Sequence, residues 1–462
     1  MSELYFDRRM SDAEGLMWRL EKDPYLTSTF GNVTVLDRKP DFDRMRRRFD
    51  RASIAIPRLH QRVQSAPGNV TPPTWVDDPD FSIDNHLRHI ALPRPGSLRQ
   101  LFDLASLIVA DPFDRTRPLW QFVVVDGLRG GKSALIQKMH HTVTDGERGV
   151  QLSLQYLDFD RDAPEPPPLP PPEAVEADDA DHPDPTGADA VRDFVVGSLR
   201  LPLGVVRQVR DLLADPAGLP NAGTAAANTL RGIVSQLADT DKARSPLWTT
   251  RSLRRRIEVT RAPFRETKDA AARLGGKLNT AFLTAAADAA ARYHIEMGSP
   301  AEALRASMAV STRTESSGAN AFSLVRMLVP TGEMPIAERF AAINEATAAA
   351  QEQSRSAGLD TLAAIASTLP TSVVTRLARQ QTQTVDFATS NVKGAPMEMY
   401  VAGAQLLENY PIGPLAGVAF NVTMLSYLGS LDMGINIDAG AVEDPALLKR
   451  CLERSLTELR NA

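Results

Sequence analysis

Apolar residues recur with two different patterns in the first third of the chain. Over residues 12–24 and 42–54 they return at helical spacing, which predicts two amphipathic helices. Shorter runs are mostly apolar without that period and predict strands, because a buried strand needs only a few such residues. These runs lie near residues 31–36, 81–91, 119–126 and 133–141.

The rest of the chain mixes the same two patterns. Alanine-rich stretches over residues 268–297 and 336–356 predict long helices, and leucines at near-helical spacing predict a last helix over residues 445–460. Strand-like runs between these helices predict further sheet structure, so both halves of the chain favour an α/β fold. These runs lie at residues 305–312, 321–329, 386–392, 399–406, 417–427 and 431–437.

A proline-rich and acidic segment over residues 161–190 interrupts both patterns. Seven prolines lie between residues 164 and 172, and an acidic tract follows them. Such a segment buries little apolar surface, which predicts an extended, mobile linker. It divides the chain into an N-terminal domain over residues 1–160 and a C-terminal domain over residues 191–462. We expect two α/β sandwiches of similar build.

Composition narrows the classes of function. The chain has 462 residues, of which 43% are apolar, enough to bury cores in about two or three domains. Its net charge of −5 gives no basic field for nucleic acid. The single cysteine, Cys451, excludes an internal disulfide and fits a reducing cytosol. The first residues form no apolar signal core, and no run of about eighteen apolar residues occurs, so we expect a cytoplasmic protein.

Two adjacent histidines, His140 and His141, stand out because the chain has only 7 histidines. They end the strand predicted over residues 133–141 and are followed by Asp145 and Gly146, so the segment reads HHxxxDG. Imidazole titrates near neutral pH and can take a proton from an alcohol or a thiol. Neighbouring side chains on a strand point to opposite faces, so only one of the two histidines faces a given cavity.

Two other interpretations of the histidine pair stand beside a general base. The pair can be purely structural, as a histidine at a strand end usually is. It can also belong to a metal site, but adjacent strand residues rarely converge on one ion, and no cysteine or third histidine lies nearby in the sequence. We favour the general base and predict no metal.

The HHxxxDG segment resembles the active-site motif of the CoA-dependent acyltransferase superfamily. That superfamily includes chloramphenicol acetyltransferase, plant alcohol acyltransferases, the condensation domains of peptide synthetases, and the bacterial wax ester synthase/diacylglycerol acyltransferases. The motif alone does not choose among these groups.

Flanking segments resemble the last of these groups, and they follow its order along nearly the whole chain. Before the histidines, residues 56–63 resemble its PRLRQRL helix end, residues 81–93 its FDxxxHxRHxxLP strand, and residues 114–120 its DRxRPLW segment. After them, residues 310–313 resemble VSxR and residues 390–394 resemble SNVPGP, and Ser426, Tyr427 and Asp438 sit where its closing strands would be.

The resemblance implies a fold and a reaction. The fold is α/β, with two chloramphenicol-acetyltransferase-like sandwich domains and an active-site tunnel between them. The reaction is direct attack of an alcohol on acyl-CoA, a co-substrate, with no other bound cofactor. His141 is then the general base, and His140 belongs to the support layer. No GxSxG nucleophile motif occurs, so we expect no acyl-enzyme.

The resemblance also suggests supporting roles for other residues. We expect Asn279 or a backbone N–H to stabilise the oxyanion. Asp145 is expected to pair with Arg313 and fix the loop after the histidines. Gly146 is expected to allow a backbone conformation that other residues resist. Asn391 is expected to brace a turn more than to bind substrate.

Two departures from the family pattern lie in the second half. The family's Asn-Asp pair is Asn279-Thr280 here, and Lys393 replaces the first proline of the SNVPGP segment. The loss of the aspartate puts in doubt either full activity or the usual acceptor preference. A threonine can still hydrogen-bond there, although it carries no charge.

Two amphipathic stretches bear on the substrate. Residues 191–213 combine an apolar set with four arginines, and residues 359–379 repeat apolar positions around Pro370. A basic amphipathic helix can lie in a membrane interface, but packing on the domain core explains each stretch equally well. With the lipid resemblance, they suggest peripheral contact with the inner face of the plasma membrane or with lipid droplets.

Three hypotheses for function follow from the resemblance. The first is a diacylglycerol O-acyltransferase that makes triacylglycerol from long-chain acyl-CoA and diacylglycerol, with wax ester synthesis as a further activity. The second is an acyltransferase of the same fold that acts on another alcohol, such as a glycolipid or a polyketide. The third is a non-catalytic lipid-binding relative. Acyl chain length, acceptor and oligomeric state are left open.

Overall fold

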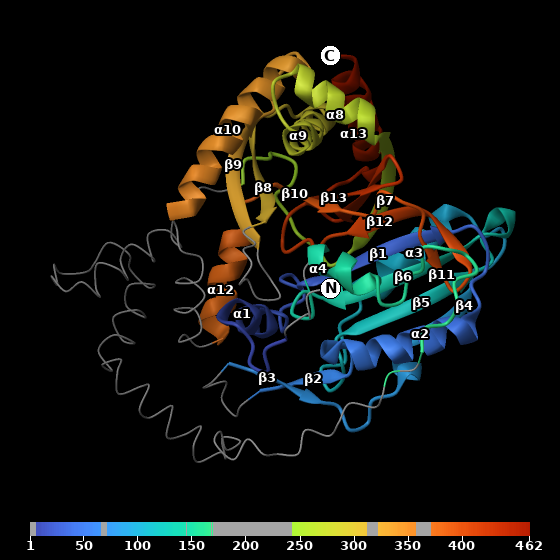
Figure 1. The fold of residues 1–462 in the computed structure, drawn as a ribbon. Helices are drawn as coiled ribbons and strands as arrows, with labels where there is room; N and C mark the ends of the chain where they lie inside the picture. The colour runs from blue at the N-terminus through green and yellow to red at the C-terminus, as the bar shows by residue number, and fades with distance from the viewer. Residues whose placement is uncertain are drawn as a thin grey trace, which may run out of the picture.

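The fold comes from a computed structural model, which describes residues 6–65, 72–144, 146–167, 169, 243–311, 322–356 and 371–462 (Figure 1). Within these ranges the strands form two six-stranded sheets and one two-stranded sheet. Most of the predicted linker and the whole stretch over residues 191–213 lie outside the described residues. Both six-stranded sheets carry helices, so each half of the chain combines strands with helices as the sequence predicts.

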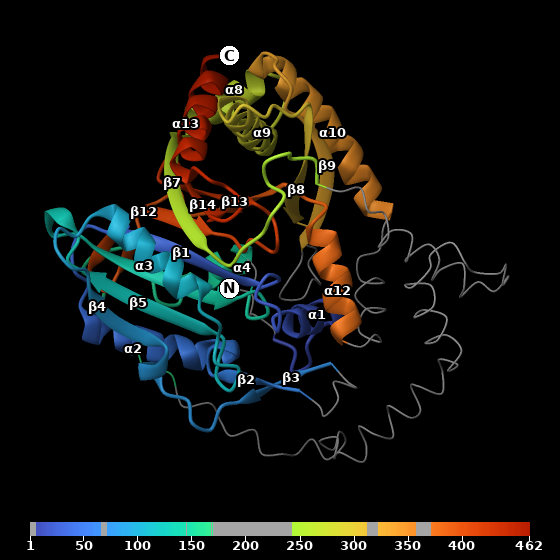
Figure 2. The same ribbon diagram turned by 180° about the vertical axis from the view of Figure 1, so that it is seen from behind.

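The first large sheet is built mainly from the N-terminal half. Its strand order is β11-β12-β1-β6-β5-β4, with β1, β6 and β5 as antiparallel neighbours. Helix α2 (Phe42–Ala55) covers one face, and Figure 2 shows α3 (Leu98–Ala110) on the other. The strands are β1 (Thr29–Leu36), β4 (Leu87–Ala91), β5 (Trp120–Asp126), β6 (Ser133–His140), β11 (Tyr400–Val401) and β12 (Ala404–Ile412).

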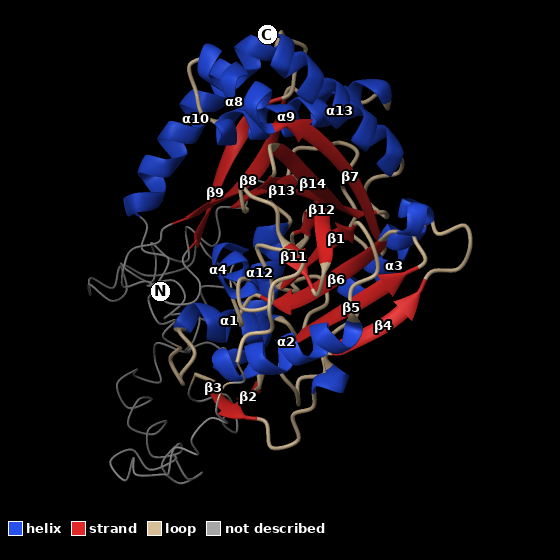
Figure 3. Ribbon diagram, turned by 45° about the vertical axis from the view of Figure 1, so that its right-hand side comes forward, coloured by secondary structure: helices blue, strands red, loops and turns tan. Residues whose placement is uncertain are grey.

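The second large sheet belongs to the C-terminal half, in the order β7-β14-β13-β10-β8-β9. Figure 3 shows its helices as one layer above the strands. The strands are β7 (Arg255–Pro263), β8 (Ala303–Ser311), β9 (Phe322–Pro330), β10 (Phe387–Lys393), β13 (Phe420–Tyr427) and β14 (Ser430–Asp438). The helices are α8 (Phe264–Arg273), α9 (Leu278–Glu296), α10 (Ile336–Ser356) and α13 (Pro445–Asn461).

Smaller elements complete the described part of the chain. Helix α1 begins with a capping box, in which Ser11 accepts from the Glu14 backbone N–H and the Glu14 carboxylate accepts from that of Ser11. Helix α1 packs against α12, where Arg19 donates to Thr371 Oγ1 at 3.2 Å. These elements are α1 (Asp12–Leu20), α4 (Gly146–Ser153), α12 (Thr371–Thr382), β2 (Gln61–Gln64), β3 (Thr74–Asp77) and the 3-10 turns Pro57–Leu59, Ile83–Asn85 and Arg129–Gly131.

The alanine-rich stretch over residues 268–297 forms two helices, α8 and α9, and not one. The break falls at two glycines. Gly275 has φ of +78°, which side chains resist, and a Cβ at Gly276 would lie 2.6 Å from the Phe340 ring. The alanines of α9 are small enough to be buried on nearly every side of the helix, between the sheet and its neighbouring helices.

The strand predicted over residues 399–406 is also two strands in the structure. Ala402 and Gly403 have φ of +46° and +84° and form the tight turn of a hairpin between β11 and β12. Strand β12 then runs on to Ile412, so most of it lies beyond the predicted range. The hairpin belongs to the first sheet, although residues 191–462 are assigned to the C-terminal domain by sequence.

Strand β12 joins the two sheets. It pairs with β1, and the backbone N–H of Asn409 donates to the buried carboxylate of Asp432 in β14 at 2.7 Å. At Gly434, also in β14, a Cβ would lie 2.0 Å from the Pro411 carbonyl oxygen. The second sheet can approach β12 this closely only because position 434 has no side chain.

The start of the predicted linker lies along α2. Arginines on one side of this helix donate to carbonyl oxygens of residues 161–167. Arg48 donates to Pro164 at 3.0 Å and Arg51 to Pro167 at 3.1 Å. An extended proline-rich segment makes no internal backbone hydrogen bonds, so its carbonyl oxygens can accept from side chains. A row of guanidinium groups can therefore hold this segment extended.

Among the described residues, none of the helices combines the length and the apolar character needed to cross a bilayer. The stretch over residues 359–379 is described only from residue 371 onward, as part of α12.

Candidate active site

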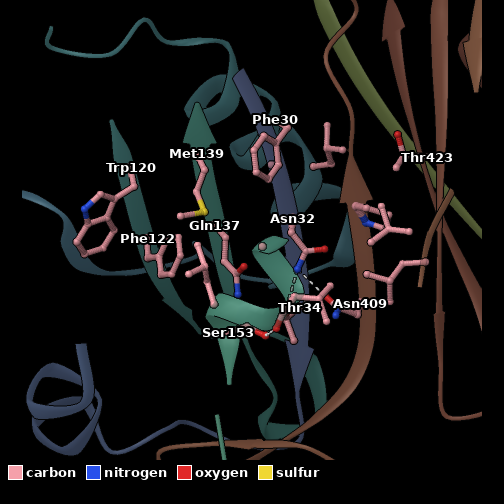
Figure 4. Close-up of a pocket in the computed structure, with 18 of the residues that line it drawn as sticks. Phe30, Asn32, Thr34, Trp120, Phe122, Gln137, Met139, Ser153, Asn409 and Thr423 are labelled. Atoms are coloured by element: carbon pink, nitrogen blue, oxygen red, sulfur yellow. Dashed lines mark hydrogen bonds between the residues drawn. The ribbon is translucent and has the colours of Figure 1, made fainter. Parts of the chain in front are cut away.

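An apolar cavity lies between the two sheets (Figure 4). Both halves of the chain contribute to its wall, which is the place where the resemblance puts a tunnel. From the N-terminal half come Phe30, Asn32, Thr34, Phe49, Trp120, Phe122, Gln137, Met139, His141, Val150 and Tyr156. From the C-terminal half come Ser390, Val392, Leu406, Asn409, Pro411, Thr423 and Leu425.

The pleat of the first sheet decides which side chains reach the cavity. On β1, Phe30, Asn32 and Thr34 alternate with residues that face α3, because successive strand side chains point to opposite faces. On β6, Gln137 and Met139 lie directly opposite Asn32 and Phe30. His141 continues this row just past the end of β6.

His141 is fixed at the cavity wall by its backbone and its ring. Its N–H donates to the Ser28 carbonyl at 3.1 Å, and its ring centroid lies 4.7 Å from that of Phe30. Burial, assisted by the neighbouring His140, lowers the pKa of His141 to about 4, against an opposing effect of Glu21. The imidazole is therefore neutral at neutral pH, the form that can accept a proton.

His140 points away from the cavity and is almost fully buried. Its Nδ1 accepts from the Thr142 backbone N–H at 3.1 Å, so the neutral ring carries its proton on Nε2. That Nε2 lies 3.1 Å from Glu21 Oε2. The two adjacent histidines thus have different surroundings, one on the cavity wall and one in the layer beneath it.

Glu21 follows the last residue of α1 and is the functional candidate that the sequence did not indicate. Its carboxylate accepts from Thr27 Oγ1 at 2.6 Å and from the Ser28 backbone N–H at 2.7 Å. Burial opposes its ionisation, but these bonds and His140 outweigh burial and hold the pKa of Glu21 below its usual value. No motif or periodicity marks Glu21, because its importance depends on a histidine far along the chain.

Other predicted site residues lie around the histidines or outside the described chain. Gly146 is the first residue of α4, which covers the cavity. Asp145 and Arg313 lie outside the described residues, so their pairing stays a prediction. Within the described chain, no group of three or more His, Cys, Asp or Glu residues is arranged to hold a metal ion.

Asn279 and Asn391 are brought together where α9 meets the second sheet. Asn391 Nδ2 in β10 donates to Asn279 Oδ1 at the start of α9, at 2.5 Å. The cavity wall contains Ser390 and Val392, the strand neighbours of Asn391, and neither asparagine. Asn279 does not line this cavity, so its position does not support the predicted role at the oxyanion. That role stays a prediction.

Thr280 forms a hydrogen bond between helices α9 and α10. It is the third residue of α9, and its hydroxyl donates to Asn344 Oδ1 in α10 at 3.1 Å. The N-cap of α9 is Lys277, which makes no side-chain capping bond. The Thr280 hydroxyl therefore joins α9 to α10, and it is not at the N-cap position of α9.

A small polar cluster interrupts the apolar wall. Asn32 Nδ2 and Thr34 Oγ1 both donate to Asn409 Oδ1, at 2.5 and 2.9 Å (Figure 4). Asn32 Oδ1 is buried and accepts no hydrogen bond within the described residues. These hydrogen bonds link the side chains of β1 to β12, and Asn32 Oδ1 can still accept from a further donor.

Comparisons with known proteins agree with this architecture. A family model for the wax ester synthase/diacylglycerol acyltransferase catalytic domain matches residues 10–282, and one for the WS/DGAT C-terminal domain matches residues 318–460. The chain belongs to this family, which makes it an acyltransferase.

Relatives and solved structures extend the agreement over nearly the whole chain. A Mycobacterium tuberculosis protein, to which diacylglycerol O-acyltransferase activity is assigned by inference, is 32% identical over 99% of this chain and 94% of its own length. The wax ester synthase/diacylglycerol acyltransferase of Marinobacter aquaeolei VT8 has a TM-score of 0.66 and 20% identity, covering 98% of this chain and 99% of its own. The first condensation domain of the calcium-dependent antibiotic synthetase has a TM-score of 0.59 and 15% identity, covering 98% and 95%. These structures confirm the predicted two-domain α/β fold.

Proposed function

We propose that this acyltransferase moves a long-chain acyl group from acyl-CoA to the free hydroxyl of diacylglycerol, with His141 as the general base. The observation that carries the proposal is the position of His141. Its imidazole is neutral and lies on the wall of an apolar cavity that both halves of the chain enclose.

In the proposed reaction, His141 takes the proton of the acceptor hydroxyl as its oxygen attacks the thioester carbonyl. The tetrahedral intermediate then collapses, its C–S bond breaks, and the CoA thiolate leaves. The imidazolium of His141 returns the proton to the thiolate, so atoms and charges balance. Acyl-CoA is the only cofactor-like molecule that the reaction needs.

The character of the wall supports a lipid substrate. Phe30, Phe122, Met139 and Leu425 offer apolar surface in the cavity that His141 also lines, and burial of each methylene of an acyl chain is worth about 0.8 kcal/mol. The relative from Mycobacterium tuberculosis supports diacylglycerol as the acceptor.

The test is acyl transfer by purified protein from labelled palmitoyl-CoA to a panel of acceptors: diacylglycerol, hexadecanol and a glycolipid. We expect labelled triacylglycerol at the highest rate and none of it with His141→Ala. Transfer to none of the acceptors by the intact protein would overturn the proposal and favour a non-catalytic lipid-binding protein.

A second candidate function is transfer to another polar lipid alcohol, and the polar cluster favours it. Asn32 Oδ1 can accept from a second hydroxyl or from an N–H, and diacylglycerol and hexadecanol have neither beside the one hydroxyl that reacts. Asn32→Leu removes this acceptor and also the bonds to Thr34 and Asn409. If a polar lipid is the natural acceptor, the variant should lose transfer to the glycolipid more than transfer to diacylglycerol or hexadecanol.

Peripheral contact with a membrane or lipid droplet belongs to the same proposal. The chain that follows α4 exposes Leu154 and Phe159, with 47% and 64% of their surface accessible, beside residues that line the cavity. Apolar side chains of this kind can enter a lipid interface. Co-flotation with diacylglycerol-containing vesicles should fall for a Leu154→Ser, Phe159→Ser double variant. Equal flotation would contradict contact through this surface.

A further inference from the structure

The loop after α1 contains a buried carboxylate beside the histidine pair His140–His141. Glu21 is the C-cap residue of α1, and only 11% of its side chain is exposed. A carboxylate is costly to bury unless donors compensate its charge. Here Thr27, Ser28 and Thr29 each provide a donor, the last at 3.3 Å. The fourth neighbour is His140.

Glu21 is linked to both histidines. Its Oε2 lies 3.1 Å from His140 Nε2, and the other ring nitrogen of His140 accepts from the Thr142 N–H. It also holds the Ser28 peptide, because the Ser28 N–H donates to Glu21 while the Ser28 carbonyl accepts from the His141 N–H at 3.1 Å. One peptide unit therefore separates the carboxylate from the backbone of His141.

We propose that Glu21 is a positioning residue for acyl transfer: its carboxylate fixes His140 and the peptide of Ser28, and through them holds the His141 imidazole against the cavity. The inference rests on the proposed role of His141 as base.

The negative charge of Glu21 has a second effect on His141. When His141 accepts the substrate proton it becomes an imidazolium in a buried site, and a nearby carboxylate stabilises that cation. Glu21 acts on the pKa of His141 in this direction, opposite to burial and His140. Lys138 and Arg115 also interact with Glu21, and Lys138 in turn donates to the Asp111 carbonyl, so these cations belong to the same electrostatic group.

The test compares Glu21→Gln, Glu21→Asp and wild type. Glutamine keeps the size and an accepting oxygen but removes the charge, and aspartate keeps the charge on a shorter stem. For Glu21→Gln we expect kcat to fall about tenfold with KM within about twofold, since one pKa unit corresponds to a factor of ten. Glu21→Asp should lose less activity.

The pKa of His141 gives a readout that a merely structural role would not move. Labelled imidazoles can be titrated by NMR, with the His141 signal assigned by its absence in His141→Ala. In Glu21→Gln the His141 titration should move to lower pH, by about one unit, because a stabilising negative charge is lost. In Glu21→Asp it should stay near its wild-type position.

Asp23→Asn is the matched control. Asp23 is a buried carboxylate two residues further on, and it bonds to Arg379 of α12 and to the Tyr25 N–H. We expect a lower Tm from this variant with an unchanged His141 titration. An unaltered His141 titration in Glu21→Gln, with activity lost only in step with folded protein, would overturn the proposal. If wild type transfers no acyl group, the proposed function fails, while the titration still tests the link between Glu21 and His141.

Discussion

At the scale of single residues, the adjacent histidines His140 and His141 have different surroundings in the structure. His141 lies on the cavity wall against Phe30, whereas His140 lies beneath it against Glu21 and Thr142. The alternation of side chains along a strand predicts that the two face different ways. The alternation does not predict which residues each histidine contacts, because Glu21 and Ser28 come from a distant segment of the sequence.

The depressed pKa of His141 predicts a pH dependence of stability. The folded value of about 4 lies below the unfolded value of about 6.5, so the unfolded chain binds more protons between these limits. This contribution is present above pH 6.5 and is lost as the pH falls toward 4. From pH 7 to pH 5, wild type should lose about 2 kcal/mol more unfolding free energy than His141→Gln.

Urea unfolding of both proteins at the two pH values measures this difference. Other buried histidines with lowered pKa, such as His86 and His294, contribute equally to both proteins and cancel. Equal losses in wild type and variant would show that His141 titrates normally in the folded chain.

At the scale of elements, periodicity located most helices and strands but not their ends. The helix predicted over residues 268–297 is divided at Gly275, and the strand predicted over residues 81–91 begins only at Leu87, after a 3-10 turn. Helix α3 and strand β7 were not predicted. Asn279 and Asn391 could be named from the motif, but their contact depends on how α9 meets β10, which no local pattern encodes.

Thr280 belongs to the element scale because it joins α9 to α10. Thr280→Val keeps the shape and removes the hydroxyl that donates to Asn344, so we expect a loss of about 1–3 kcal/mol in unfolding free energy. Thr280→Asp restores the family residue but places a carboxylate against the Asn344 oxygen unless that amide turns. It should change kcat/KM by less than about twofold if Thr280 only braces the helices.

Denaturation of Thr280→Val and steady-state kinetics of Thr280→Asp test this bracing role. A severalfold gain in kcat/KM for Thr280→Asp would mean that the charge of the family aspartate assists the reaction and that this chain is a weakened enzyme.

At the scale of the whole molecule, the two halves are joined by a strand that crosses between them. The composition of residues 161–190 predicts a division into two domains, but the pairing of β12 with β1 has no local signal. Pairing partners far apart in sequence are chosen by the assembled fold. Gly434 lies where β14 packs against β12, and the Pro411 carbonyl can approach it closely because glycine has no side chain.

Gly434→Val should therefore destabilise the protein by about 3 kcal/mol, because β12 and β14 must separate to admit the side chain. Gly15→Ala in α1 is a matched control, with Pro73 at an ordinary 3.4 Å from the new Cβ, and should be neutral or stabilising by up to about 1 kcal/mol. Unfolding followed by tryptophan fluorescence compares them. Equal stability of Gly434→Val and wild type would contradict close packing at this joint.

The central claim is that His141 is the base of an acyl transfer to a lipid alcohol, and one kinetic comparison tests it most directly. Initial rates of transfer from labelled palmitoyl-CoA to diacylglycerol are measured for wild type, His141→Ala and His140→Ala, together with their melting temperatures. We expect His141→Ala to lose about 10²–10⁴-fold in kcat at a nearly unchanged Tm, and His140→Ala to lose less activity and more stability. Equal, mild losses from both substitutions would contradict the account.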